Sequence, residues 1–328
     1  MRRWSLGQLL IVLLASVALW AVLAAACLAV GSTGWRFPDP SNPERMEPVI
    51  IASIVGAALA AAGVVYQAIL RNPLAEPYLL GVSSGAALAV YVWTLPLAVG
   101  TVLDQVSQQS SAFVGALVAL VIVFMLAQRR GRLQPVTLLL VGVIVNAING
   151  AIYLLLYYIN LRRNLSSSPG EAFGFLVGGI KSYLLVEQIA SAGVVVLVGW
   201  IVLLYLSGQL NVAMVSEAEA EALGVRIQRL RWIGLVVASL VTAAAMSISG
   251  PIAFIGLVCP HIARLVVGND QRRLLPVATA LGAGLLALAD AGTRVLGSVP
   301  QVGQVPVGVI TGFLGGPFFL YLLWRSNR

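Results

Sequence analysis

Apolar stretches recur along this chain from residue 9 to residue 324, and short polar loops separate them. Each stretch has the length of about 20 residues that an α-helix needs to cross the hydrocarbon core of a bilayer. The 328 residues are 59% hydrophobic and 10% charged, whereas ordinary soluble domains are about 45 to 50% apolar. The sequence therefore predicts an all-α, polytopic membrane protein with about ten transmembrane helices, forming one domain over residues 1–328 in a lipid bilayer.

The basic residues are scattered through short loops and form no face or tail, which argues against a nucleic-acid partner despite the net charge of +8. Cytoplasmic loops of membrane proteins carry an excess of Lys and Arg. With the N-terminus inside and ten spans, fourteen of the 20 basic residues fall on the cytoplasmic side, so we expect both termini in the cytoplasm. The six on the outer side are Arg36, Arg45, Arg162, Arg163, Lys181 and Arg294.

The longest polar interruption runs from residue 216 to residue 231, within a cytoplasmic loop predicted at about 207–231. Ser216 followed by Glu219 has the form of a capping box, and Gly224 is a natural helix stop. We therefore expect a helix over 217–223, which is too short to be stable alone in water. Its glutamates keep it out of lipid, so it would need a partner protein to pack on. The alternative is a solvated connecting loop.

Gly and Pro interrupt the apolar pattern once in each half of the chain. Non-helical backbone at membrane depth is tolerated only where protein or a water-lined cavity covers it, so each interruption is either a structural turn or a gate element. Such a pair is typical of transporters built from related halves. The residues are Asn72, Pro73, Pro77 and Gly81 in the first half, and Gly250, Pro251 and Pro260 in the second, where Pro260 is expected to break the eighth span.

The fifth span, predicted at about 135–159, carries Asn146, Asn149, Tyr153 and Tyr157. Spacings of three, four and four residues place these side chains on one face of a helix. Polar groups in hydrocarbon are costly unless they are paired or wetted. The stripe therefore faces either a translocation pathway or a neighbouring helix to which it is hydrogen-bonded.

Nothing in the sequence can hydrolyse a nucleotide. A phosphate-binding loop needs Gly-Lys before Ser or Thr, but the only lysine, Lys181, follows Ile180. The two cysteines, Cys27 and Cys259, lie in separate apolar segments with no metal-ligand spacing. We therefore predict no catalytic residue, cofactor or metal site, and any driving ATPase must be another chain.

Two other classes of function remain open at this point. Asp290 and Glu187 are intramembrane carboxylates of the kind that a proton-coupled secondary transporter would use, although both lie near predicted span ends. Ser249 and His261 permit an intramembrane protease, but no second feature places the histidine against the serine.

Two motifs resemble signatures of the FecCD family of permeases. The first is Asn-Pro-Leu-Ala-Glu-Pro at 72–77, followed by Leu-Leu-Gly-Val-Ser-Ser-Gly at 79–85. The second is Gly-Pro-Ile-Ala-Phe-Ile-Gly-Leu at 250–257, followed by Pro-His-Ile-Ala-Arg at 260–264. The resemblance extends over nearly the whole chain. It implies the membrane subunit of a type II ABC importer for haem, ferric siderophores or cobalamin.

From the resemblance we expect a homodimer in the bacterial inner membrane, with the pathway at its two-fold axis. It also implies a periplasmic substrate-binding protein and two cytoplasmic ABC ATPase subunits, which bind ATP and Mg. The loop between spans six and seven would couple to the ATPase through Ser216, Glu217, Glu219, Glu221, Ala222, Leu223, Gly224 and Arg226.

The resemblance also assigns expectations to the outer surface. Arg45 and Arg294 are candidates to dock the binding protein, although Glu47-Pro48 stands where the family often has Pro-Arg. Arg162 and Arg163, at the outer mouth above tyrosines, suit a flat anionic ring. We therefore expect an iron chelate as substrate, with haem slightly favoured, a ferric siderophore next, and cobalamin as the alternative.

Overall fold

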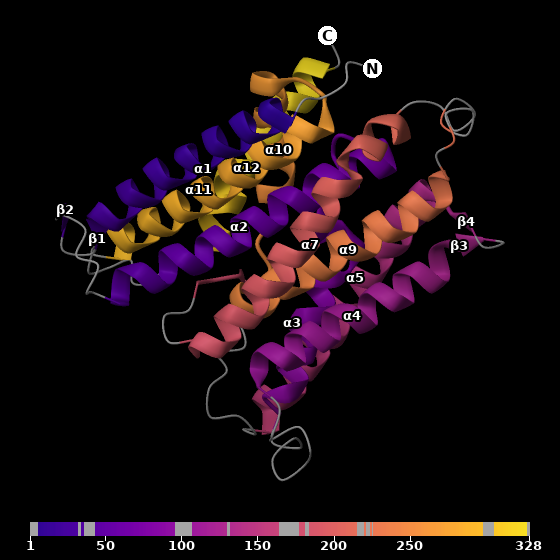
Figure 1. Ribbon diagram of the computed structural model, residues 1–328. Helices are drawn as coiled ribbons and strands as arrows, with labels where there is room; N and C mark the ends of the chain where they lie inside the picture. Colours follow the sequence, from indigo (N-terminus) through magenta and orange to yellow (C-terminus); the bar gives the residue numbers. More distant parts are fainter. Residues whose placement is uncertain are drawn as a thin grey trace.

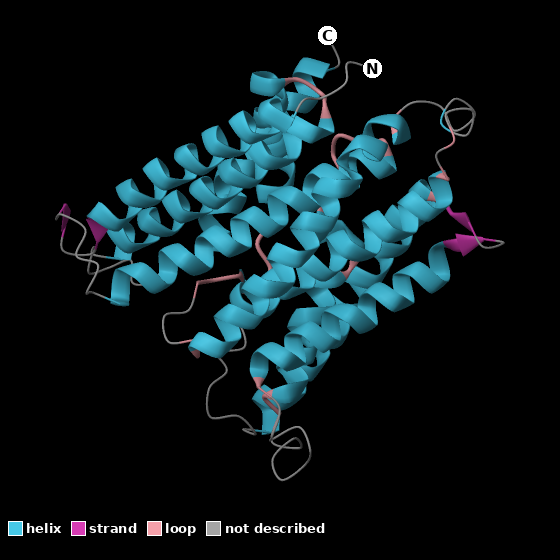
Figure 2. Cartoon of the chain, in the orientation of Figure 1, coloured by secondary structure: helices cyan, strands magenta, loops and turns pink. Residues whose placement is uncertain are grey.

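The computed structural model describes residues 6–31, 34–35, 43–95, 107–129, 132–163, 177–180, 184–214, 220, 224, 226–297 and 305–326. Within these ranges the chain is almost entirely helical (Figure 2). Seven helices are long and apolar enough to cross a membrane, and three shorter apolar helices accompany them. The prediction of an all-α protein with about ten transmembrane helices is confirmed.

The elements follow the order of the apolar stretches. The long helices are α1 (Leu6–Ala29), α2 (Pro43–Leu70), α4 (Gln108–Ala127), α5 (Pro135–Arg163), α7 (Val186–Ala213), α9 (Ile227–Ser249) and α11 (Gln271–Gly297). The other helices are α3 (Val82–Trp93), α10 (Ile255–Val267), α12 (Val307–Ser326) and the 3-10 helix η1 (Pro77–Leu80). Two-residue strands form two small antiparallel ladders, β1 (Val30–Gly31) with β2 (Gly34–Trp35), and β3 (Gln128–Arg129) with β4 (Arg132–Leu133).

The helices run roughly along one direction and form two groups around a shared centre (Figure 1). Helices α1, α11 and α12 lie on one side of α2, while α3, α4 and α5 lie on the other side of α9. The central helices α2 and α9 are the most buried of the seven long helices. The start of α1, the end of α12, the end of α7 and the β3–β4 ladder lie at one end of the bundle, and β1–β2 lies at the other.

Glycines allow two pairs of neighbouring helices to touch at their backbones. Gly56 of α2 faces Gly282 of α11, and a Cβ atom added to either would collide with the carbonyl oxygen of the other. Gly85 of α3 and Gly115 of α4 meet in the same way. Small residues permit such approach in membrane helices, where packing replaces the hydrophobic effect as the driving force. The Gly- and Ala-rich sequence at 56–63 predicts close packing of this span, and the contact at Gly56 confirms it.

Several element ends differ from those predicted. The Pro-rich sequence at 37–45 predicts an extended segment. Helix α2 nevertheless begins at Pro43, because proline is well suited to the first position of a helix. Helix α7 continues to Ala213 and α9 begins at Ile227, so these two helices include both ends of the loop predicted at about 207–231. Cys27 and Cys259 are both buried and unbridged.

Candidate functional site

The two Gly/Pro-interrupted elements meet in the centre of the protein. The carboxylate Oε2 of Glu76, in the first element, accepts a hydrogen bond of 3.1 Å from the backbone N–H of Phe254, in the second. The side-chain amide Nε2 of Gln67 donates to the carbonyl oxygen of Gly256 at 3.2 Å. We call these four residues the clasp. The clasp holds the first turn of α10 against the end of α2 and the turn that follows it.

Pro260 does not break the eighth span, and the prediction on this point is wrong. Helix α10 runs from Ile255 to Val267 with Pro260 inside it. Proline has no N–H to donate to the carbonyl four residues earlier, which here is Gly256. Gln67 supplies the missing donor to that carbonyl. The interruption lies instead at 250–254, between α9 and α10.

The first interruption is a compact turn. The side-chain oxygen of Asn72 accepts from the backbone N–H of Leu74 at 2.9 Å, and its carbonyl accepts from the N–H of Ala75 at 3.1 Å. Pro77 then opens η1, and Gly81, with φ of +81°, ends η1 and begins α3. Asn side chains and glycines at positive φ are the ordinary means of reversing a chain. For this segment the structure displays the turn that was one of the two alternatives.

The second interruption is built on glycines as well. Gly250, with φ of +70°, ends α9 and donates to the carbonyl of Met246 at 2.8 Å. The short segment 177–180 lies alongside: Gly179 donates to the carbonyl of Ser249 at 2.8 Å, and Gly308 of α12 donates to the carbonyl of Gly178 at 3.1 Å. This segment therefore joins the end of α9 to the start of α12.

Ser249 has a structural partner in this region. Its hydroxyl lies 3.0 Å from the carbonyl oxygen of Ala245 and 2.9 Å from that of Gly250, and the residue is buried. His261, on α10, lies edge-on to the ring of Phe318 on α12, with ring centroids 6.0 Å apart. The serine thus satisfies its hydroxyl as helical serines commonly do.

The two asparagines of the polar stripe on α5 contact the first interruption and α3. Asn146 donates to the carbonyl of Tyr78 at 3.0 Å, and Asn149 donates to the hydroxyl of Ser84 at 3.0 Å. The oxygen of the Asn146 side chain is buried with no hydrogen-bond partner among the described residues. Within one copy of the chain, the asparagines make the interhelical hydrogen bonds that were the alternative to a pathway.

The tyrosines of the stripe form an aromatic cluster with α3. The ring of Tyr91 lies 4.6 Å from that of Tyr153 and 6.3 Å from that of Tyr157, measured between centroids. Asn160 donates to the hydroxyl of Tyr91 at 3.2 Å. Asn160 continues the helical spacing three residues beyond Tyr157 and was not singled out from the sequence, although that spacing could have identified it.

The charged residues expected at the outer end have partners of their own. Arg162 lies over the ring of Tyr158, 5.4 Å from its centroid, and donates to the Tyr158 hydroxyl at 3.1 Å. Arg294 forms an ion pair of 3.2 Å with Asp290, one helical turn earlier on α11. Arg45 donates to the carbonyl of Leu28 at 3.4 Å. The side chain of Arg163 lies outside the described residues.

Most of the predicted coupling segment also lies outside the described residues, namely Ser216, Glu217, Glu219, Glu221, Ala222 and Leu223. Gly224 is exposed at φ of +78° with no atom near its missing side chain, which agrees with a glycine that stops a helix. Arg226 is exposed and precedes α9. Docking and coupling therefore stay predictions.

The stem of this loop is fixed by a hydrogen-bonded corner. Asn211, in the last turn of α7, donates to the carboxylate of Asp270 at 2.8 Å and accepts from the backbone N–H of Gln271 at 2.8 Å. The same carboxylate oxygen accepts from the N–H of Arg272 at 3.1 Å. Asp270 thus caps α11 and anchors α7 to it. Neither residue was identified from the sequence, because the partners are about 60 positions apart.

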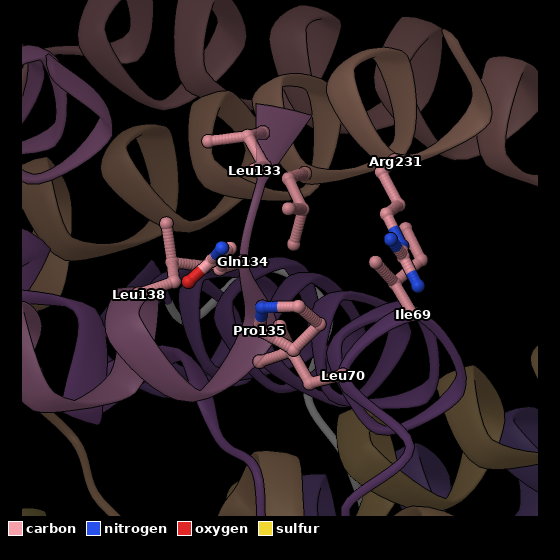
Figure 3. Close-up of a pocket in the computed structure, with 8 residues that line it drawn as sticks. Ile69, Leu70, Leu133, Gln134, Pro135, Leu138 and Arg231 are labelled. Atoms are coloured by element: carbon pink, nitrogen blue, oxygen red, sulfur yellow. The ribbon is translucent and has the colours of Figure 1, made fainter. Parts of the chain in front are cut away.

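An apolar crevice lies beside the start of α9 (Figure 3). Ile69 and Leu70 from the end of α2 line it together with Pro135 at the start of α5, and Arg231 points into it from α9. The crevice is too narrow to hold a water molecule, so it is a packing seam and not a binding cavity.

Known proteins resemble this chain over most of its length. A cobalamin import system permease from Halobacterium salinarum is 41% identical over 85% of this chain and 72% of its own. A hemin transport system permease from Yersinia pestis is 39% identical over 87% of this chain and 83% of its own. The solved structure of a metal-chelate type ABC transporter in an inward-facing conformation matches with a TM-score of 0.80 and 28% identity, covering 97% of this chain and 99% of that one.

A model of the FecCD transport family matches residues 41–325, which include both interrupted elements and the corner at Asp270. The match covers far more than the two motifs quoted from the sequence. The chain therefore belongs to the FecCD transport family.

Proposed function

We propose that this chain is the membrane permease of an ATP-driven importer for a metal chelate, which receives its substrate from a separate binding protein. The observation that carries the proposal is the end-to-end match, at 28% identity, to a metal-chelate type ABC transporter. Relatives that match over more than four-fifths of this chain include permeases named for cobalamin, hemin and ferric enterobactin.

ATP hydrolysis is assigned to a partner subunit, because the sequence has no phosphate-binding loop. The partner would bind at 214–226, where Gly224 and Arg226 are exposed between α7 and α9. The corner at Asn211 and Asp270 supports this role, since it gives the loop a rigid stem. Movement of the ATPases would then be delivered to α7 and α11 together.

Two copies of the chain are proposed to enclose the pathway. The face of α5 opposite the polar stripe is apolar and exposed, as is much of α12.

Alternating access would require the partner proteins to bind the outward and inward conformations with different affinity. The interruptions at 72–81 and 250–254 are the gate elements in this proposal, because they provide the non-helical backbone at which helices can change direction.

The membrane orientation follows the distribution of basic residues. We place the end of the bundle that holds the start of α1 and the end of α12 in the cytoplasm of a bacterial cell, and β1–β2 on the periplasmic side of the inner membrane. The periplasmic side then holds Arg45, Arg162, Arg163 and Arg294. Of these, Arg45 and Arg294 are proposed to dock the binding protein.

Haem is the first substrate to test. Arg162 is exposed and stacked on Tyr158, and a cation over an aromatic ring suits a flat anionic ligand. A ferric siderophore is the next candidate among iron chelates. Cobalamin is the alternative, and the 41% identity to a cobalamin permease favours testing it.

The experiment is reconstitution of the complete transporter in proteoliposomes with its ATPase and binding protein. Hemin, ferric enterobactin and cobalamin are offered one at a time, and ATP-dependent uptake is followed by absorbance of the trapped compound. We expect one of the three to accumulate only with ATP. Uptake driven by a proton gradient without the ATPase would overturn the proposal in favour of a secondary transporter.

A further inference from the structure

Glu76 is a carboxylate in apolar surroundings, and only 8% of the residue is exposed. Burying such a group is costly unless it is hydrogen-bonded. Its oxygen accepts from the N–H of Phe254, at the start of α10, where free backbone N–H groups and the helix dipole favour negative charge. A residue from the first half of the chain therefore caps a helix in the second half.

Phe254 is held in an unusual backbone conformation, with φ of +70° and ψ of −23°. This left-handed region is unfavourable for any residue with a Cβ atom. Non-glycine residues remain there only where their surroundings over-determine the conformation, and such positions are concentrated at functional and switching regions. Glu76 provides one determinant, since it binds the backbone N–H of Phe254.

The ring of Phe254 provides the second determinant. It lies against Gly315 of α12, where an added Cβ atom would collide with the Cβ and Cγ atoms of the phenylalanine. Gly315 is buried, while the neighbouring Phe313 and Leu314 are exposed on the other face of α12. Phe254 thus connects the other clasp residues to α12. Its ring fills a notch at Gly315, and any side chain at that position would close the notch.

We propose that Glu76 is a positioning residue for import. By fixing Phe254, it makes three elements move as one unit: the turn after α2, the first turn of α10, and helix α12. The inference rests on the proposed function, because only a transporter needs these elements to move together. Loss of the Glu76 contact would release Phe254 from its left-handed conformation and withdraw its ring from the notch. ATP hydrolysis would then continue without productive movement of α12.

The test measures both ATP hydrolysis and uptake in proteoliposomes that hold the complete transporter, with hemin, ferric enterobactin and cobalamin offered one at a time. Glu76→Ala removes the acceptor, Glu76→Gln keeps an oxygen that can accept the same bond, and Gly315→Val fills the notch from the α12 side. Thr279→Val is the control, because it removes a different, partly buried hydrogen bond, of 2.9 Å from Trp200 between α7 and α11.

We expect Glu76→Ala and Gly315→Val each to raise the ATP consumed per substrate imported about tenfold, with ATP hydrolysis within twofold of wild type. In Glu76→Gln and Thr279→Val, the ATP consumed per substrate imported should stay within twofold of the wild-type value. The double variant Glu76→Ala/Gly315→Val should be no worse than either single variant, since both break one connection. If Glu76→Ala is not inserted into the membrane, Gly315→Val decides by the same ratio.

An unchanged ratio in the variants that insert would overturn the inference, as would additive effects in the double variant. Failure of Glu76→Gln to preserve the ratio would show that the hydrogen bond is not what matters, and would also overturn it. Absence of ATP-dependent uptake by the wild-type transporter would overturn the proposed function itself. Failure of the proposed function is thus read from the wild type, and failure of the inference about Glu76 is read from the variants.

Discussion

Gly56 and Gly282 face each other across the contact between α2 and α11, so closely that neither can carry a side chain without meeting the backbone of the other. We expect Gly282→Ala to separate the two helices and to destabilise the protein by about 1 to 3 kcal/mol, the usual cost of overpacking. Thermal unfolding in detergent measures the effect.

The matched control is Gly150→Ala on α5, because no atom lies within 4 Å of the position its Cβ would take. Alanine is favoured over glycine in a helix by about 1 kcal/mol, so this variant should be unchanged or slightly more stable. Equal destabilisation of both variants would contradict the backbone contact.

Asn146→Leu/Asn149→Leu should reduce uptake about tenfold while the chain still assembles with its ATPase. The two amides hold α5 to Tyr78 and Ser84, and interhelical hydrogen bonds in membranes contribute on average about 0.6 kcal/mol each, too little for their loss to prevent insertion. The measurements are uptake and co-purification of the ATPase.

Thr137→Val is the control, because it removes a polar contact on the exposed start of α5. It should change neither uptake nor co-purification of the ATPase. Normal uptake in the double variant would mean that the stripe serves only helix packing.

Gly224→Pro should abolish ATP-coupled uptake without removing the chain from the membrane. Proline fixes φ near about −65°, which is incompatible with the φ of +78° at Gly224. Uptake, ATPase binding and membrane content are measured together.

Gly268 offers a matched position for this experiment, since it is an exposed glycine at φ of +77° outside the predicted coupling segment. Gly268→Pro imposes the same backbone conflict and also removes the N–H that bonds to Arg264. Retained uptake in this variant, with loss in Gly224→Pro, would locate coupling at 214–226. Loss in both would leave backbone strain as the explanation.

The corner at Asn211 and Asp270 predicts non-additive stability changes. The variants Asn211→Ala, Asp270→Ala and the double variant should show an interaction energy of about 0.5 to 3 kcal/mol, the range for residues that share one hydrogen-bond network. Chemical unfolding of the purified protein supplies the values. Pairing Asn211→Ala with Thr279→Val, which belongs to a separate contact, should give simple addition.

The length of the apolar stretches was enough to predict the membrane helices, because the hydrocarbon core of the bilayer imposes a length that an apolar helix must match. Helix ends were less predictable: α2 starts at Pro43 and α7 runs to Ala213, since turns near the bilayer surface tolerate polar and prolyl residues. The Pro260 prediction failed for a specific reason. Gln67 satisfies the carbonyl that proline leaves free, and that compensation comes from almost 200 residues away.

The stripe on α5 was predictable as a face but not as a contact. Spacing aligned Asn146 with Tyr157, whereas only the fold shows that Tyr78, Ser84 and Tyr91 lie opposite. Glu76 was visible as a carboxylate between prolines, yet its partner Phe254 is 178 positions away. Local sequence identifies groups that need partners, and tertiary structure decides which partners they obtain.

The start of α1 and the end of α12 lie at the same end of the bundle (Figure 1). A linker from the C-terminus of one copy to the N-terminus of another therefore has no membrane to cross. Two copies can be encoded as one tandem polypeptide, in which a substitution such as Glu76→Ala is placed in one half alone. Such a chain would reveal how many intact clasps a paired transporter requires.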